Sequence, residues 1–128
     1  MPVRSELLPY GRQSIDDTDI RAVTDVLRSP FLTTGPTVQE FENAFAAEVG
    51  SKYAVAVSSG TAALHAMMAA LDVGPGDEVI VPAITFAASA NCALYQGARP
   101  IFCDVDPETL LIDVEDAERL ITSRTKAV

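Results

Sequence analysis

Apolar residues recur at helical spacing in two stretches near the start of the chain. The first stretch follows Asp16 and Asp17, whose negative charges suit the start of a helix, and Pro30 would end it. The second begins at residue 36 or 37, and Gly50 is its expected end. The apolar positions that share a face are Ile20, Val23, Val26 and Leu27 in the first stretch and Val38, Phe41, Phe45 and Val49 in the second. The pattern predicts helices over residues 16–28 and 36–49.

From residue 53 onward, short apolar runs typical of strands alternate with longer helical stretches. We expect strands over residues 53–57, 78–81 and 100–105, a further strand beginning at residue 125, and helices over residues 61–73, 86–96 and 114–121. This alternation predicts an α/β fold with a mostly parallel sheet. Helix 61–73 is apolar nearly all round, so we expect it to be buried between the sheet and another layer.

The domain organisation follows from the same pattern. Residues 1–14 contain several helix breakers and are interpreted as an arm, whereas residues 15–128 form the α/β part. The last residues resemble a strand that has only begun. We therefore interpret the chain as the N-terminal part of a larger three-layer αβα domain.

The turn at residues 58–60 is the strongest candidate for a binding site. It joins the expected strand at 53–57 to a run of helix formers that starts at Thr61, so it exposes backbone N–H groups at the start of a helix. These donors and the helix dipole favour an anion, and Gly60 would let a phosphate approach the backbone closely. The alternative is that Ser58 or Ser59 simply caps a helix of the core.

Phe86 is a second candidate, because it follows the next expected strand. In an open parallel sheet, ligands bind outside the carboxyl ends of the strands, where both Phe86 and the turn at 58–60 are expected. A phosphate site and an aromatic face could together hold a flat phosphorylated heterocycle. A core role for Phe86 is the alternative. Neither GxGxxG nor GxxxxGK[ST] occurs, which argues against dinucleotide-binding and P-loop sites.

Composition narrows the classes of function. The formal net charge is −9 and no basic cluster occurs, which argues against nucleic acid and anionic membrane surfaces as partners. Cys92 and Cys103 lack the spacing of a redox or zinc site and are expected to be buried thiols, and His65, the only histidine, is expected to pack in the core or between helices. We expect no metal site. Neither a signal peptide nor a membrane span is recognised, so we expect a cytoplasmic protein.

Five ordered motifs carry a resemblance to a known family. They are Leu8-Pro-Tyr-Gly-Arg-Gln-Ser-Ile-Asp16, Phe31-Leu-Thr-Thr-Gly-Pro36, Val57-Ser-Ser-Gly-Thr-Ala-Ala-Leu64, Gly74-Pro-Gly-Asp-Glu-Val-Ile-Val-Pro82, and Thr85-Phe86 with Ala90-Asn91. Together they resemble the DegT/DnrJ/EryC1/StrS family of sugar aminotransferases. The first two most resemble the branch that acts on UDP-4-keto-6-deoxy-N-acetyl-altrosamine in pseudaminic acid synthesis.

The resemblance implies the large domain of a fold type I enzyme that depends on pyridoxal phosphate. Such an enzyme is usually a homodimer and moves an amino group from glutamate to a keto sugar on a nucleotide. By motif match, the residues implied to bind the cofactor are Gly60, Thr61 and Ala62 at its phosphate and Phe86 against its ring. Those implied to line the sugar-nucleotide site are Tyr10, Pro30, Phe31, Leu32, Thr33 and Gly60.

The chemistry of such an enzyme also needs a lysine that binds the cofactor covalently and a carboxylate at the pyridine nitrogen. Lys52 and Lys126 match neither position, so no catalytic residue is expected in this chain, and the chain alone is expected to be inactive. Some relatives replace the lysine with histidine and act as dehydratases, and others have regulatory roles. A non-transaminating relative and a solitary nucleotide-binding module are the alternatives.

Overall fold

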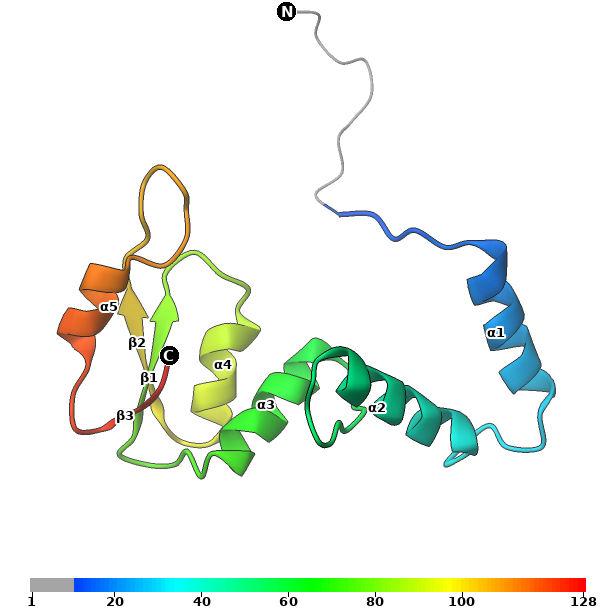
Figure 1. The fold of residues 1–128 in the computed structure, drawn as a ribbon. Coiled ribbons are helices and arrows are strands. Elements are labelled where there is room, and N and C mark those ends of the chain that lie inside the picture. Colours follow the sequence, from blue (N-terminus) through cyan, green and yellow to red (C-terminus); the bar gives the residue numbers. More distant parts are fainter. Residues whose placement is uncertain (1–10) are drawn as a thin grey trace, which may run out of the picture. The chain divides into compact units, whose positions relative to one another are not determined.

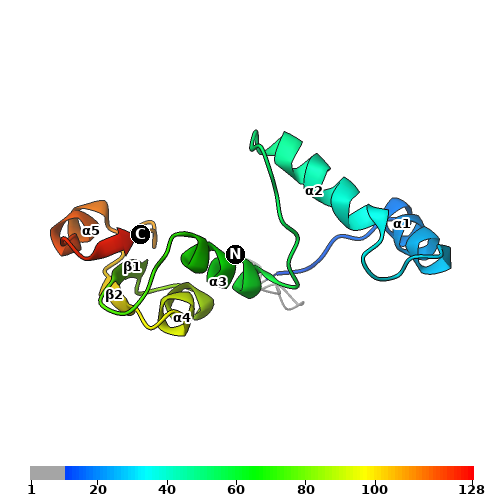
Figure 2. The same ribbon diagram turned by 90° about the horizontal axis from the view of Figure 1, so that it is seen from below.

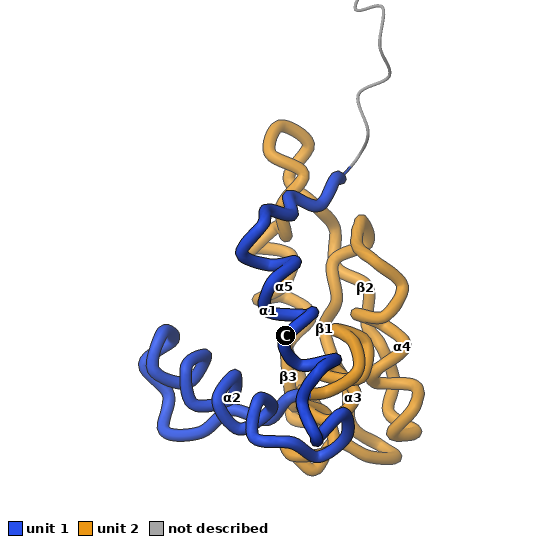
Figure 3. The backbone as a smooth tube through the Cα atoms, turned by 90° about the vertical axis from the view of Figure 1, so that its right-hand side faces the viewer, with its two compact units in different colours: residues 1–56 blue, residues 57–128 orange. Residues whose placement is uncertain are grey.

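The computed structural model describes residues 11–128, which form two compact units (Figure 3). The described residues of the first unit are 11–56, and the second unit spans residues 57–128. Within residues 11–128, no helix combines the length and apolarity needed to cross a bilayer.

The first unit contains helices α1 (Asp17–Arg28) and α2 (Pro36–Glu48), as predicted (Figure 1). Asp16 caps α1 by accepting hydrogen bonds from the N–H groups of Thr18 and Asp19 at 2.7 and 3.1 Å, and the Asp19 carboxylate accepts one from the Asp16 N–H in return. The hydrogen bonds from Asp19 and Thr18 lower the pKa of Asp16. The local sequence thus sets the start of α1, and Pro36 stands at the first position of α2.

The apolar faces of these two helices are present but uncovered within the first unit. No residue of α1 is buried, and Ala46 is the one buried residue of α2. Phe41 and Phe45 lie next to each other, with ring centroids 5.9 Å apart. Gly50 has a φ of +67°, the left-handed conformation expected where a helix ends.

The second unit contains the sheet (Figure 1). Its strands are β1 (Glu78–Pro82), β2 (Arg99–Cys103) and β3 (Thr125–Ala127), and its helices are α3 (Gly60–Ala70), α4 (Ala88–Tyr95) and α5 (Val114–Leu120). The strand order is β2-β1-β3, and both pairs are parallel, with Ile80 opposite Ile101. The predicted parallel α/β fold is confirmed. Four consecutive residues of the central strand are buried, as expected for a strand covered on both faces.

Alternate residues of β1 face two different cores. Val79 and Val81 pack with Met68 of α3 and with Cys92 and Ala93 of α4. Ile80 packs on the other face with Cys103 and with Ala117 of α5. Helix α4, with α3 packed against it, therefore lies on one face and α5 on the other, which gives the three-layer αβα arrangement seen from below in Figure 2.

Two predictions about the start of the sheet are wrong. Residues 53–57 form no strand, because none of the described strands pairs with them, and the Ala56 N–H donates instead to the Glu42 carboxylate at 2.8 Å. Helix α3 is also not buried on all sides. Met68 is its one buried residue and Met67 is 55 % exposed, because α4 and one face of the sheet supply its only neighbours in this core.

Candidate functional site

The turn before α3 has the geometry of a capped helix start. Ser59 is the N-cap residue, with an extended backbone, and its hydroxyl accepts a hydrogen bond from the Ala62 N–H at 3.1 Å. The Ser59 carbonyl accepts the next N–H, that of Ala63, at 3.0 Å. The alternative in which a serine caps this helix is therefore correct as far as Ser59 is concerned.

Capping by Ser59 still leaves donors at the helix start. Among the described residues, the N–H groups of Gly60 and Thr61 have no hydrogen-bond partner, and neither has the Thr61 hydroxyl. Two backbone donors and one hydroxyl are thus available to an anion at the positive end of the helix dipole. The Ala62 N–H is not available in this way, because it already donates to the Ser59 hydroxyl. A ligand could accept a hydrogen bond from it only by displacing that hydroxyl.

Gly60 is not required by the fold of the described chain. A Cβ added at this position would meet no atom within 4 Å, and its φ lies outside the left-handed region. Gly97, by contrast, has a φ of +75°, and its added Cβ would lie 3.2 Å from Pro75 Cγ. The backbone at Gly60 is therefore open to close approach from outside the chain, which suits a phosphate group.

Phe86 lies in the loop between β1 and α4, just before the helix starts. Its side chain is 76 % exposed, so it is not a core residue in the described structure. The loop leaving β1 leads to α4 and the loop leaving β2 leads to α5, and these helices cover opposite faces of the sheet. Loops that diverge at the carboxyl ends of adjacent strands form the crevice where open α/β sheets bind ligands.

The expected substrate-binding residues Pro30, Phe31, Leu32 and Thr33 form the loop between α1 and α2 in the first unit. Phe31 and Leu32 are 58 % and 64 % exposed. Gly35 permits the tight bend of this loop, because an added Cβ would lie only 2.9 Å from Phe31 Cβ. Tyr10 lies outside the described residues. The structure therefore places Gly60–Ala62 and Phe86 in one unit and residues 30–33 in the other.

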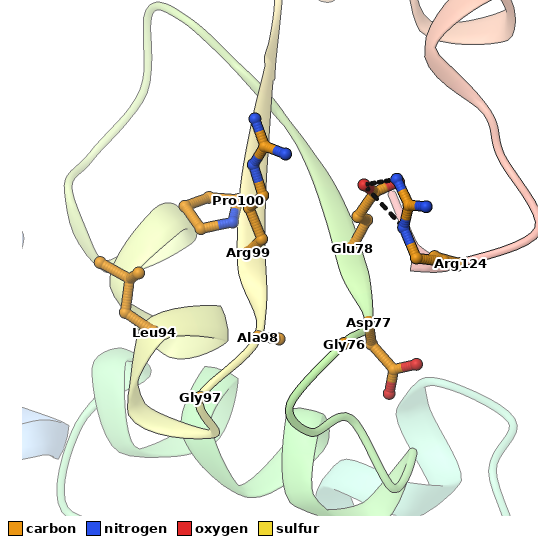
Figure 4. Close-up of a pocket in the computed structure, with 9 residues that line it drawn as sticks. All are labelled: Gly76, Asp77, Glu78, Leu94, Gly97, Ala98, Arg99, Pro100 and Arg124. Carbon is orange, nitrogen blue, oxygen red and sulfur yellow. Dashed lines mark hydrogen bonds and ion pairs between the residues drawn. The ribbon is translucent and has the colours of Figure 1, made fainter.

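A hollow of about 400 Å³ lies at the opposite, amino ends of β1 and β2 (Figure 4). Its lining includes Glu78, Arg99 and Arg124, and it contains none of the expected site residues. The Arg124 guanidinium donates from Nε and Nη2 to Glu78 Oε1 at 3.1 and 2.6 Å, and the Thr122 hydroxyl donates to Glu78 Oε2 at 2.6 Å. These contacts join residues more than forty positions apart, so they tie β1 to the segment before β3. Their role is structural.

Glu78 makes the stability of the protein depend on pH in a defined direction. The hydrogen bond from Thr122 and the contacts with Arg124 lower the pKa of Glu78 below its ordinary value of 4.5. A carboxyl group with a lowered pKa stabilises the folded state fully above its unfolded pKa and loses that contribution as the pH falls through its folded pKa. We expect Glu78→Gln to lower the free energy of unfolding at neutral pH, with a gap from wild type that narrows below pH 4.5.

Thermal or denaturant unfolding of the full-length protein across the acidic range would measure this gap. Glu40→Gln, at an exposed position on α2, is the matched control and should leave stability nearly unchanged. A gap that stays constant or widens on acidification would contradict the assignment.

The remaining candidates carry no chemistry in the described part of the chain. Cys92 and Cys103 are buried, as predicted, and burial together with nearby Asp116 raises the pKa of the Cys103 thiol. His65 packs against Tyr95 between α3 and α4, with ring centroids 5.2 Å apart, which matches the expected interhelix role. Residues 11–128 contain no group of side chains able to hold a metal ion.

The sequence interpretation missed the hydroxyl pair next to Phe86. Thr85 Oγ1 and Ser89 Oγ lie 3.0 Å apart and share a hydrogen bond. Two hydroxyl residues four positions apart at a helix start could have signalled this contact.

Comparison with known proteins identifies the family. The DegT/DnrJ/EryC1/StrS aminotransferase family matches residues 13–128. This chain belongs to that family. The family resemblance expected from the motifs is therefore confirmed over nearly the whole chain.

Two relatives named for sugar metabolism match most of the chain. The UDP-4-amino-4-deoxy-L-arabinose–oxoglutarate aminotransferase of Shewanella sediminis is 46 % identical over 97 % of the chain and 32 % of its own length. The spore coat polysaccharide biosynthesis protein SpsC of Bacillus subtilis is 49 % identical over 98 % of the chain and 32 % of its own length. The chain thus spans about a third of the length of these relatives.

Solved structures match the same region. The sugar aminotransferase Spr1654 of Streptococcus pneumoniae in its pyridoxal-phosphate form has a TM-score of 0.84 and 38 % identity, over 92 % of this chain and 30 % of that one. The GDP-4-keto-6-deoxy-D-mannose-3-dehydratase of E. coli, with bound hydrated pyridoxal phosphate, has a TM-score of 0.82 and 38 % identity, over 91 % and 32 %. The fold of this chain therefore matches that of about a third of these pyridoxal-phosphate enzymes.

Proposed function

We propose that this chain is the N-terminal part of an aminotransferase that uses pyridoxal phosphate to move an amino group from glutamate to a nucleotide-linked keto sugar. Family membership and the named sugar aminotransferases among the relatives support this reaction class. In this proposal the enzyme acts in the cytoplasm as a homodimer.

One structural observation carries the proposal: the unpartnered donors at the start of α3. The N–H groups of Gly60 and Thr61 and the Thr61 hydroxyl would hold the cofactor phosphate at a helix start where Gly60 leaves room for it. Phe86, exposed at the carboxyl end of β1, would stack against the cofactor ring. The Ala62 N–H would also donate to the phosphate once its hydrogen bond to the Ser59 hydroxyl is broken. The bound cofactor would supply an electron sink for amino transfer.

The proposed substrate is a UDP-linked deoxysugar with a keto group at C4, of the kind used for surface polysaccharides or pseudaminic acid. The relative that acts on a UDP-4-amino sugar supports the nucleotide and the position, and the motifs that include Tyr10 and the 31–36 loop support the altrosamine branch. Residues 30–33, which are exposed, would contact the sugar nucleotide together with Tyr10 and Gly60.

The second candidate function is a sugar dehydratase that uses the same cofactor. The structural similarity to the E. coli dehydratase is as close as that to several aminotransferases, which favours keeping this candidate. Nothing in Gly60–Ala62 or Phe86 separates the two reactions, since both need the cofactor held in the same way.

Incubating the full-length protein with pyridoxal phosphate, glutamate and a UDP-4-keto-6-deoxy sugar tests the proposal. We expect stoichiometric formation of 2-oxoglutarate and a UDP-4-amino sugar, detected by mass spectrometry. Loss of a hydroxyl group from the sugar without gain of an amino group, in the presence of glutamate, would support the dehydratase instead, and absence of both reactions would support a regulatory relative.

We further expect the 128-residue chain alone to lack transaminase activity. Its two lysines lie away from the α3 turn in sequence, Lys52 beside the Tyr53 ring at 5.0 Å and Lys126 in β3, and neither matches the position of the lysine that would bind the cofactor. The purified chain is assayed beside the full-length protein under identical conditions. Glutamate-dependent amination by the short chain would contradict the assignment.

A further inference from the structure

The direction of the Phe86 ring is not fixed by packing within the described chain. The side chain is 76 % exposed, and no aromatic pair among the described residues includes it. A ring that stacks on a flat ligand loses less entropy when it is held in place before the ligand arrives. The backbone that carries Phe86 must therefore supply the order that packing does not.

Ser89 holds this backbone on both sides of the Phe86 Cα atom. Its N–H donates to the Phe86 carbonyl at 2.9 Å, on the C-terminal side. Its hydroxyl shares a hydrogen bond of 3.0 Å with the Thr85 hydroxyl, on the N-terminal side. Two hydrogen bonds made by Ser89, a half-buried residue, thus hold the chain on either side of Phe86.

At the start of α4, no other side chain of the described residues holds the backbone around Phe86 by a hydrogen bond. Its N-cap residue is Ala87, which has no side-chain hydrogen bond to the first turn. The loop is tied to the sheet at its beginning, where the Ala83 N–H donates to the Cys103 carbonyl at 2.8 Å. Between that point and the helix, the bond between Thr85 and Ser89 is the only side-chain hydrogen bond in the described structure.

We propose that Thr85 and Ser89 are positioning residues that orient Phe86 for stacking on the cofactor ring. This inference rests on the proposed function, because it assumes that Phe86 contacts the cofactor. Neither hydroxyl needs to touch the cofactor for this role. Their effect on cofactor affinity passes through Phe86.

Titration of the full-length apo-protein with pyridoxal phosphate tests the proposal. Thr85→Val keeps the shape of the side chain, and Ser89→Ala keeps the backbone N–H, so each removes only the shared hydrogen bond. We expect each to weaken cofactor affinity about 2- to 12-fold, the range for a neutral hydrogen bond. The double variant should lose no more than either single one, and Ser89→Thr, which restores a hydroxyl, should recover most of the affinity.

Phe86→Leu separates the positioning role from a general effect on folding. In the Phe86→Leu background, Thr85→Val should cause no further loss of affinity. Thr24→Val is the matched control, because the Thr24 hydroxyl also makes one hydrogen bond, to the Ile20 carbonyl at 2.8 Å on α1, and it should leave affinity unchanged.

The outcomes distinguish this proposal from the proposed function. In one outcome, Phe86→Leu weakens cofactor affinity while Thr85→Val weakens it further in that background, by as much as it does in wild type. That result overturns the positioning role of Thr85 and leaves the stacking role of Phe86 intact. If Phe86→Leu leaves affinity unchanged, both are overturned. Unchanged affinity in Thr85→Val and Ser89→Ala alone also overturns the positioning role.

Discussion

Gly60→Val is expected to weaken binding of pyridoxal phosphate to the full-length protein on the order of a hundredfold or more, while the apo-protein keeps its thermal stability. The isopropyl group would occupy the space in which the phosphate meets the N–H groups of Gly60 and Thr61. Two hydrogen bonds to a charged group, each worth roughly 1.5–3 kcal/mol, would be lost together. The fold should tolerate the change because an added Cβ meets no atom of the described residues within 4 Å.

Gly97→Ala is the matched control for this prediction. Gly97 has a φ of +75° and lies against Pro75, so alanine there is strained by roughly 1–2 kcal/mol from the left-handed conformation. It should lower the melting temperature and leave cofactor affinity unchanged. If Gly60→Val instead lowers the melting temperature as much as Gly97→Ala does, with unchanged affinity, then Gly60 serves only the fold.

Thr61→Ala is expected to weaken cofactor affinity by about tenfold to a hundredfold, with activity restored by excess cofactor. The Thr61 hydroxyl has no partner among the described residues, so its removal breaks no internal contact. A hydrogen bond from this hydroxyl to a charged phosphate oxygen would account for roughly 1.5–3 kcal/mol.

Equilibrium titration and activity at rising cofactor concentration would measure the Thr61→Ala effect. Ser58→Ala, which removes a neighbouring hydroxyl from the same turn, is the control and should have a smaller effect. A Thr61→Ala protein with wild-type affinity and a slightly altered melting temperature would mean that this turn only starts a core helix.

Local signals in the sequence predicted most elements of the fold. Asp16 and Asp113 cap α1 and α5 through their carboxylates, and Gly50 and Gly97 end α2 and α4 in left-handed conformations. These positions can be predicted from the sequence because a cap or a left-handed turn depends on one residue and its immediate neighbours. The buried strand β1 could likewise be predicted from its continuous apolar run.

Features that depend on distant residues could not be predicted from local patterns in the sequence. Residues 53–57 have the composition of a strand, but a strand exists only where another strand completes its ladder, and none does so in the described chain. The contact of Glu78 with Arg124 joins residues 46 positions apart and leaves no local trace. The exposure of Met67 likewise depends on which layers cover α3.

The same distinction between local and distant features applies to the candidate site. The α3 turn was found because a serine, a glycine and a threonine before a helical run are a local pattern, and the structure adds which donors there lack partners. Residues 30–33 belong to the other unit, and no local pattern in the sequence links them to this turn.

We propose above all that the start of α3 binds the cofactor through its phosphate. Comparing the affinities of the full-length wild type and Thr61→Ala for pyridoxal phosphate and for pyridoxal, which lacks the phosphate, tests this claim most directly. We predict that Thr61→Ala weakens binding of pyridoxal phosphate by about tenfold to a hundredfold and leaves pyridoxal binding unchanged. An equal loss for both ligands, or no loss for either, would contradict the assignment of Gly60 and Thr61 to the phosphate.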